Sequence, residues 1–186
     1  MKYDYWYWKN YLSSTQIIKI NQFINKLPIT NEPISFAATG SNKRKKKFLK
    51  TSLVEWKLLN PFFPNLWEMI VQANLENFGY DITYLNNDIF HYNFYSSKTK
   101  DRYDWHIDTS TNNRTDLKFT IIINISDKIY QGGKFKLFSN TEYEVSELNT
   151  AGSMIMFKSH INHKVEPVTK GERKTLSLFI KGPAFK

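Results

Sequence analysis

Two residues with the chemistry of metal ligands, His106 and Asp108, stand close together near the middle of the chain. In a β-strand the side chains of residues i and i+2 leave the same face, so an imidazole and a carboxylate separated only by Ile107 can bind one ion together. The same spacing also fits a surface histidine beside a solvated aspartate, and an H-x-D pair alone is a weak motif. The pair predicts half of a metal site.

Residues later in the chain fit the remainder of such a site. His163 would supply a second imidazole, and two histidines with one carboxylate form the facial arrangement of non-haem Fe(II) sites, which leaves positions open for substrate. Arg173 follows a turn predicted at Lys170-Gly171, and its planar guanidinium suits a dicarboxylate whose other end chelates the metal. Thr175 shares the face of Arg173 in a regular strand and could add a hydroxyl donor.

Two rival assignments concern neighbouring residues. His160 precedes His163 by three positions, so in a regular strand it leaves the opposite face, and we interpret it as a loop residue or a support for the site. Arg173 could be one more surface cation. Period-two alternation sends Lys170 and Lys174 outward, however, so these lysines fit the surface role better.

The pattern of apolar residues predicts two helices followed by short strands. Residues 13–27 form an amphipathic helix with a Ser13-x-x-Gln16 capping box and Pro28 as its stop, and residues 65–78 form a second helix before Gly79. The period then changes to two, which predicts a double-sheet jelly roll buttressed by amino-terminal helices. The predicted strands are 89–95, 103–108, 117–125, 133–138, 152–157, 161–168 and 173–181.

Several motifs in order resemble one enzyme family. They are Tyr103-Asp-Trp-His106-Ile-Asp108, Gly132-Gly133-Lys-Phe, and His163-Lys-Val-Glu-Pro-Val-Thr-Lys-Gly-Glu-Arg173. Together they resemble the iron- and 2-oxoglutarate-dependent dioxygenases of the prolyl 4-hydroxylase type, over roughly residues 89–181 and weakly at the amino end. The resemblance implies a cupin-like double-stranded β-helix that is mainly β with flanking helices. It also implies Fe(II), 2-oxoglutarate and O2, with ascorbate as a candidate reductant.

The resemblance also implies roles for particular residues. His106, Asp108 and His163 would bind the iron and form the catalytic centre, and Arg173 would pair with the C5 carboxylate of 2-oxoglutarate. Tyr95 resembles a family tyrosine that lies beside 2-oxoglutarate, although a core role fits it as well. An aspartate at position 108 favours hydroxylation, because relatives that halogenate carry a small residue there.

The implied reaction is hydroxylation of an aliphatic C–H bond, coupled to decarboxylation of 2-oxoglutarate to succinate and CO2. The expected substrate is a prolyl or other residue of a peptide or protein, or a free amino acid. One alternative has the same iron chemistry but acts as an oxidative demethylase of nucleic-acid bases. Another is a non-catalytic jelly-roll binding module, or one that holds Zn(II) structurally.

Some further residues have two possible roles. Tyr103 is either a pocket wall or a packing residue, and Trp56 either lines a substrate groove or fills the core. His91 is interpreted as a packed or hydrogen-bonded strand histidine that lines the pocket. The pair Gly132-Gly133 predicts a tight turn into a strand, because no helix pattern follows it to form a phosphate cradle.

Composition limits the remaining possibilities. With 186 residues, 41% of them hydrophobic, the chain fits one domain over 1–186, with helical support over about 1–80 and a jelly-roll core over about 85–182. We expect no membrane segment and no signal peptide, and the absence of cysteine fits a cytoplasmic location. The net charge of +9 favours anionic partners, an acidic substrate before nucleic acid.

The sites of substrate selection are expected in loops outside the motifs. Residues 29–60 and 96–102 are the candidates. The first contains the basic run 43–47, which is either a solvated loop or a flap that attracts an acidic or nucleic-acid substrate. Neither the substrate nor the oligomeric state follows from the sequence.

Overall fold

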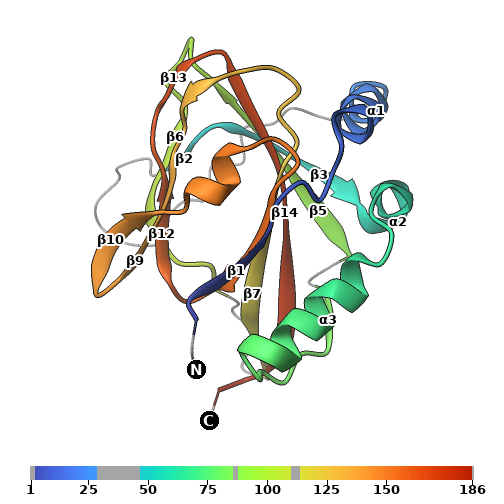
Figure 1. The fold of residues 1–186 in the computed structure, drawn as a ribbon, viewed down its shortest axis with the longest axis vertical. Helices are drawn as coiled ribbons and strands as arrows, with labels where there is room; N and C mark the ends of the chain where they lie inside the picture. Colours follow the sequence, from blue (N-terminus) through green and yellow to red (C-terminus); the bar gives the residue numbers. More distant parts are fainter. Residues whose placement is uncertain (1–2, 29–46, 86–87, 110–113, 186) are drawn as a thin grey trace.

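The computed structural model describes residues 3–28, 47–85, 88–109 and 114–185, which fold mainly into strands (Figure 1). The basic run 43–47 and most of the predicted loop 29–60 lie largely outside these residues. The strands are β1 (Tyr5–Trp8), β2 (Lys47–Phe48), β3 (Lys50–Glu55), β4 (Tyr84–Leu85), β5 (Ile89–Ser96), β6 (Arg102–His106), β7 (Thr115–Asn124), β8 (Gln131–Gly132), β9 (Phe135–Ser139), β10 (Thr141–Glu144), β11 (Met154–Lys158), β12 (Asn162–Val165), β13 (Val168–Lys170) and β14 (Glu172–Pro183).

Both predicted helices are present. The first, α1 (Ser14–Ile24), begins with the predicted capping box, in which Ser13 and Gln16 hydrogen-bond reciprocally. The second, α3 (Leu66–Asn77), ends before Gly79, whose φ of +69° is the left-handed conformation that favours glycine after a helix. The shorter helices are α2 (Trp56–Leu59) and the 3-10 turns η1 (Asn60–Phe62) and η2 (Ser146–Asn149). Among the described helices, none is long and apolar enough to cross a membrane.

Two antiparallel sheets form the predicted jelly roll. The major sheet has the order β1-β11-β7-β14-β5-β3, with β4 also paired to β14, and the minor sheet has the order β10-β9-β12-β6-β2. In Figure 1 the helices α1, α2 and α3 lie on one side of the major sheet and the minor sheet lies on the other. The short pair β13-β8 forms a separate two-stranded sheet, and in chain order its strands lie between β7 and β9 and between β12 and β14. The prediction of a mainly β jelly roll supported by helices is confirmed.

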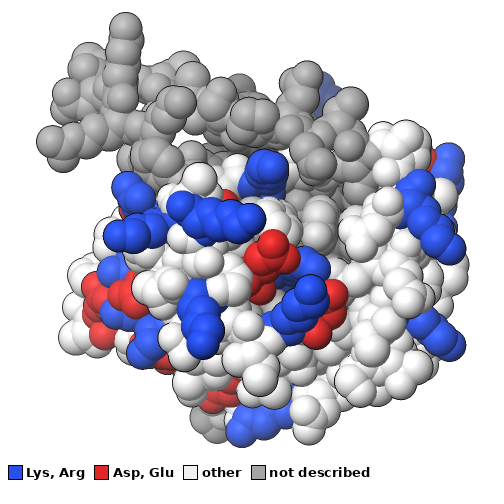
Figure 2. Space-filling view, turned by 90° about the horizontal axis from the view of Figure 1, so that it is seen from above, with Lys and Arg blue, Asp and Glu red and all other residues white. Residues whose placement is uncertain are grey.

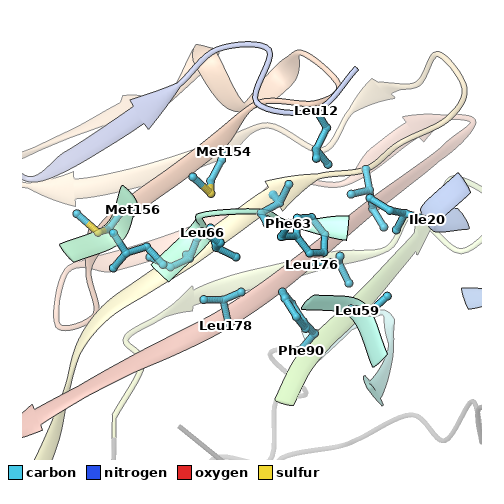
Figure 3. Close-up of a cluster of buried hydrophobic side chains, with 14 of the residues drawn as sticks. Leu12, Ile20, Leu59, Phe63, Leu66, Phe90, Met154, Met156, Leu176 and Leu178 are labelled. Carbon is cyan, nitrogen blue, oxygen red and sulfur yellow. The ribbon is translucent and has the colours of Figure 1, made fainter. Parts of the chain in front are cut away.

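The core is divided between the two faces of the major sheet. On the helix side, Leu176 and Leu178 of β14 pack with Ile20 of α1 and Leu66 of α3 (Figure 3). On the side facing the minor sheet, the alternate residues of the same strands include Arg173, Thr175, Thr120 and Asn93, all buried. These four polar side chains therefore lie in the space between the two sheets.

The amino-terminal strands β1 and β3 were not predicted from the sequence. The amino-terminal region also contributes strands, because β1 pairs with β11 and β3 pairs with β5. The second of these lies inside the predicted loop 29–60. Of the two roles left open for Trp56, packing in the core is the one observed: Trp56 begins α2 and stacks on Phe90 at 5.1 Å between ring centroids, against the helix-side core.

Lys174 is also different from the prediction, because it is buried and not directed to solvent. The prediction assumed that one face of its strand is solvated, but the segment after β7 covers that face. Lys174 Nζ lies 2.7 Å from Asp127 Oδ1, and the backbone N–H of Lys174 donates to the Ser126 hydroxyl. The lysine is therefore part of a partly buried ion pair, because Asp127 itself is exposed.

Candidate metal centre

His106 and His163 are direct neighbours on adjacent strands of the minor sheet. They are paired residues of the antiparallel strands β6 and β12, so their side chains leave the same face of the sheet. Their ring centroids lie 4.0 Å apart. Residues distant in sequence are brought together by strand pairing, and strand-borne side chains are held more rigidly than those on a loop.

Asp108 reaches the two imidazoles from just beyond the end of β6. The predicted strand extended to this residue, but β6 ends at His106 and the Asp108 N–H donates to the carbonyl of Ser159. Even so, Asp108 Oδ1 lies 3.8 Å from His106 Nε2, and Oδ2 lies 3.4 Å from His163 Nε2. One ligand atom from each of the three residues falls within 4.8 Å of the others, a grouping that could hold a metal ion.

Backbone carbonyls orient both imidazoles toward this cluster. His106 Nδ1 lies 2.8 Å from the carbonyl of Asp104, and His163 Nδ1 lies 2.9 Å from the carbonyl of Ile161. A carbonyl oxygen can only accept, so each Nδ1 carries the hydrogen, and the lone pair of each Nε2 is available to a cation. Such an outer hydrogen bond is the usual companion of a metal-binding histidine.

Aromatic rings surround the cluster. Tyr103 stacks on His106 with ring centroids 3.5 Å apart and an interplanar angle of 16°. Phe157 meets His163 edge-on at 4.8 Å, and Phe135 lies 5.7 Å from the same ring. His163 is only 3% exposed. These rings exclude water from one side of the cluster, which strengthens electrostatic interactions within it.

Arg173 is completely buried on the inner face of β14, with 1% of its surface exposed. Its Nε and Nη2 atoms have no hydrogen-bond partner. A buried guanidinium with unpaired donors is costly, so the arrangement fits a protein that awaits an anion at this position. This observation supports a carboxylate-binding role, which the resemblance implied for Arg173.

Tyr95 is the cross-strand partner of Arg173 on β5, and the guanidinium carbon lies 5.1 Å from its ring centre. Burial raises the pKa of Tyr95 to about 12, the Arg173 guanidinium opposes the shift, and the Asp108 carboxylate contributes to the rise. Burial also raises the pKa of Tyr103, again with a contribution from Asp108. Both phenols therefore stay protonated near neutral pH, and both lie within the electrostatic influence of the cluster.

The other residues considered from the sequence fall into two groups. Thr175 is buried on the same strand face as Arg173, as predicted. His91 shares the inward face of β5 with Tyr95 and meets Phe179 edge-on at 5.0 Å. His160, in contrast, is exposed in a turn beside Phe185 and does not join the cluster.

Sequence reasoning missed two hydroxyls beside the aspartate. Thr120 Oγ1 donates to Asp108 Oδ2 at 2.7 Å, and Ser159 Oγ lies 3.1 Å from Thr120 Oγ1. The only available signal was a single threonine within the otherwise apolar run Phe119 to Ile123. A hydroxyl residue in a fully buried strand suggests a polar partner, but the sequence does not identify that partner.

Comparison with known proteins defines the class. The model of the 2OG-Fe(II) oxygenase superfamily matches residues 90–181, the segment that contains the cluster and Arg173. A PKHD-type hydroxylase of Herminiimonas arsenicoxydans is 28% identical over 170 residues, covering 87% of this chain and 72% of that protein. Another, from Pseudoalteromonas atlantica, is 34% identical over 103 residues, covering 51% and 44% of the two chains.

Solved structures share the fold. A Pseudomonas putida prolyl-4-hydroxylase superimposes with a TM-score of 0.69 at 12% identity, covering 97% of this chain and 94% of that one. The viral collagen prolyl hydroxylase of Paramecium Bursaria Chlorella virus-1 gives 0.67 at 15% identity, with 97% of each chain covered. The chain belongs to the 2OG-Fe(II) oxygenase superfamily and is a 2-oxoglutarate-dependent dioxygenase. The resemblance to the prolyl 4-hydroxylase type is confirmed, and with it the requirement for Fe(II), 2-oxoglutarate and O2.

Proposed function

We propose that the protein hydroxylates a prolyl or other aliphatic residue of a peptide or protein, with His106, Asp108 and His163 as the iron ligands. We further propose that Arg173 binds the distal carboxylate of 2-oxoglutarate, with Tyr95 and Thr175 as additional polar contacts. The observation that carries the proposal is the buried Arg173, whose unpaired donors face the same inter-sheet space as the His-His-Asp cluster.

The residues present fit the metal and the co-substrate. Two imidazole nitrogens and one carboxylate suit Fe(II) and leave coordination positions for a chelating keto-acid and for O2. When bound, Fe(II) and 2-oxoglutarate together activate O2, so that one oxygen atom enters a substrate C–H bond and the other enters succinate as CO2 is released. The planar fork of a guanidinium matches a carboxylate with two parallel hydrogen bonds, which a lysine could not supply.

The contribution of the chain itself is orientation and exclusion of water. The carbonyls of Asp104 and Ile161 fix the two imidazoles in the tautomer that presents Nε2. The protonated phenol of Tyr95 stands beside Arg173 as a further donor. Phe135 and Phe157 close one side of the site to solvent. Positioning of this kind is what the protein supplies in cofactor-dependent oxidation.

The comparisons support a peptide or protein substrate. One structural neighbour is a prolyl hydroxylase of Trichoplax adhaerens in complex with a fragment of the hypoxia inducible factor oxygen degradation domain, with a TM-score of 0.65 at 16% identity. The net charge of +9 favours an acidic sequence around the target residue. A free amino acid with an aliphatic side chain is a smaller substrate of the same chemical class.

The test is a substrate screen with a defined co-substrate readout. The purified protein is incubated with Fe(II), 2-oxoglutarate and O2 against proline-containing peptides of matched length and graded acidity. Gain of one oxygen atom on the peptide, together with Fe(II)-dependent succinate, is the expected result. Both signals should disappear in His106→Ala and Asp108→Ala proteins that retain the unfolding midpoint of the wild type. Metal-independent succinate, or full activity in either variant, would contradict the proposed ligands.

The net charge also favours a second candidate, a nucleic-acid base demethylase. Figure 2 shows Lys and Arg spread over the described part of one face with Asp and Glu among them. Some of these charges pair with each other, as Lys136 does with Glu142 and Glu166. The same assay with methylated oligonucleotides decides between the two candidates. Demethylation together with binding that weakens steeply with salt would favour the nucleic acid.

A further inference from the structure

Asp108 differs from the two histidines in how it is held. Both histidines lie within paired strands, whereas Asp108 lies beyond the last residue of β6. Its backbone has one tie to the neighbouring segment, the N–H donated to the Ser159 carbonyl at 3.0 Å. The direction of its carboxylate must therefore be fixed by contacts of the side chain.

The shortest side-chain contact is with the hydroxyl of Thr120, which donates to Asp108 Oδ2 at 2.7 Å, while His163 Nε2 lies 3.4 Å from the same oxygen. An ionised carboxylate only accepts, so the single hydroxyl hydrogen of Thr120 is committed to it. The 3.1 Å contact between Ser159 Oγ and Thr120 Oγ1 then has Ser159 as the donor. The result is a chain of two hydroxyls that ends on one specific oxygen of the aspartate.

This donor is fixed more firmly than a surface residue would be. Thr120 lies in the middle of β7, paired with Phe157 of β11 on one side and Phe179 of β14 on the other. It is 2% exposed, and Ser159 is fully buried. A β-branched side chain has restricted χ1 freedom, and the central strand cannot shift without breaking two ladders. The hydroxyl therefore presents a stationary donor to Asp108.

We propose that Thr120 is a positioning residue of the iron site, which holds Asp108 Oδ2 against β7 and thereby fixes the direction in which the carboxylate faces the two imidazoles. The inference rests on the proposed function, because it takes Asp108 as a ligand. Ligation through one oxygen preserves three open positions on a six-coordinate ion. A carboxylate released from Thr120 could swing and bind through both oxygens, which would leave two.

Three variants separate the hydroxyl from its surroundings. Thr120→Val removes the donor with little change of shape and keeps β-branching, Thr120→Ser keeps the donor, and Ser159→Ala removes only the second hydroxyl. Mn(II) affinity is measured without co-substrate from the electron paramagnetic resonance signal of the free ion. The charge-transfer absorption of the anaerobic Fe(II) and 2-oxoglutarate complex gives a second readout, and thermal unfolding checks the fold.

We expect Thr120→Val to weaken Mn(II) binding by roughly 10- to 100-fold and to alter the charge-transfer band, as removal of an outer partner of a metal ligand does. Thr120→Ser should stay within about threefold of the wild type, and Ser159→Ala should lose less than Thr120→Val, because the direct hydrogen bond survives. If Thr120→Val is unfolded at the assay temperature, Thr120→Ala replaces it in the same comparison.

The outcomes distinguish this inference from the function on which it rests. Wild-type Mn(II) affinity and an unchanged band in a folded Thr120→Val protein would overturn the positioning role and leave the iron site standing. Failure of the wild type to bind Mn(II) or Fe(II), with Asp108→Ala indistinguishable from it, would instead overturn the proposed ligands.

Discussion

Gly133 lies directly against the stem of Arg173. A β-carbon at position 133 would stand 2.8 Å from Cδ of Arg173 and 3.0 Å from Cγ2 of Val168. The backbone at Gly133 also has a φ of +63°, where L side chains are strained. Both the close contact and the positive φ require glycine. Through the close contact, the turn before β9 packs against Arg173, the residue that we propose binds 2-oxoglutarate.

Gly133→Ala is therefore expected to displace Arg173 and to raise the KM for 2-oxoglutarate more than it changes kcat. The backbone strain should also cost about 1–2 kcal/mol of stability. Gly79→Ala is the matched control, because Gly79 has a φ of +69° with nothing within 4 Å of an added β-carbon. Both variants should lose stability, and only Gly133→Ala should lose co-substrate affinity. Equal KM values in the two proteins would show that the contact with Arg173 has no role.

Arg173 is expected to lower the stability of the protein without its co-substrate. Because its Nε and Nη2 are buried and unpaired, Arg173→Met should leave the free energy of unfolding unchanged or raise it by about 1–3 kcal/mol. In the wild type with Mn(II), 2-oxoglutarate at a hundred times its Kd should add about 2.7 kcal/mol, and the variant should lose most of this gain. Denaturant unfolding with and without 2-oxoglutarate measures both effects. Marked destabilisation of the variant without ligand would mean that Arg173 has a structural role.

A site residue could be predicted from the sequence when its position depends on local strand periodicity and motif order, and not when it depends on the packing of distant strands. The grouping of His106, Asp108 and His163 could be predicted, because strand periodicity and motif order constrain it directly. Thr120 and Ser159 could not, because their contact with Asp108 depends on how β7 and the end of β11 lie in space. Strand β3 was missed because its sequence follows a polar segment that suggested a loop.

Lys174 shows the corresponding limit for the fold. Alternation correctly separates it from Arg173, but it cannot tell whether the opposite face of the strand meets solvent or another segment. In the structure that face is covered by residues 125–127, whose backbone and side chains bind Lys174. A strand in the centre of a covered sheet is buried on both faces. The alternation of side chains then separates two faces of the strand that are both inside the protein.

Asp127→Ala should destabilise the protein without affecting metal binding. The substitution leaves the buried Lys174 ammonium without its carboxylate, which lies 2.7 Å from it. Because Asp127 is exposed and solvent screens the pair, we expect a loss of about 0.5–1 kcal/mol. The double variant Asp127→Ala with Lys174→Met should recover part of this loss, because no buried charge is then unpaired. Chemical denaturation of the four proteins gives the coupling between the residues, and additive effects would mean that the ion pair contributes nothing.

Tyr95→Phe tests whether the phenol takes part in binding 2-oxoglutarate. Because burial raises the pKa of Tyr95 to about 12, its hydroxyl is protonated and able to donate throughout the neutral range. The variant keeps the ring beside the Arg173 guanidinium and removes the hydroxyl, together with its hydrogen bond to Arg173. We expect a loss in 2-oxoglutarate affinity of about 5- to 10-fold, equivalent to one neutral hydrogen bond, with Mn(II) affinity unchanged. An unaltered Kd for 2-oxoglutarate in calorimetry would assign Tyr95 to the core.

His160 and His163 are only three residues apart, and their metal-binding roles can be compared directly. His163 is buried with its Nε2 facing Asp108. His160 is mostly exposed beside Phe185, where partial desolvation and the nearby Lys158 ammonium lower its pKa. A lowered pKa leaves His160 neutral and chemically competent to bind a metal, so its position and not its protonation state must exclude it. His163→Ala should abolish Mn(II) binding and succinate formation, while His160→Ala should retain both within about twofold, the range expected for surface substitutions. Loss of metal binding in His160→Ala, measured on protein with a wild-type unfolding midpoint, would require a different ligand set.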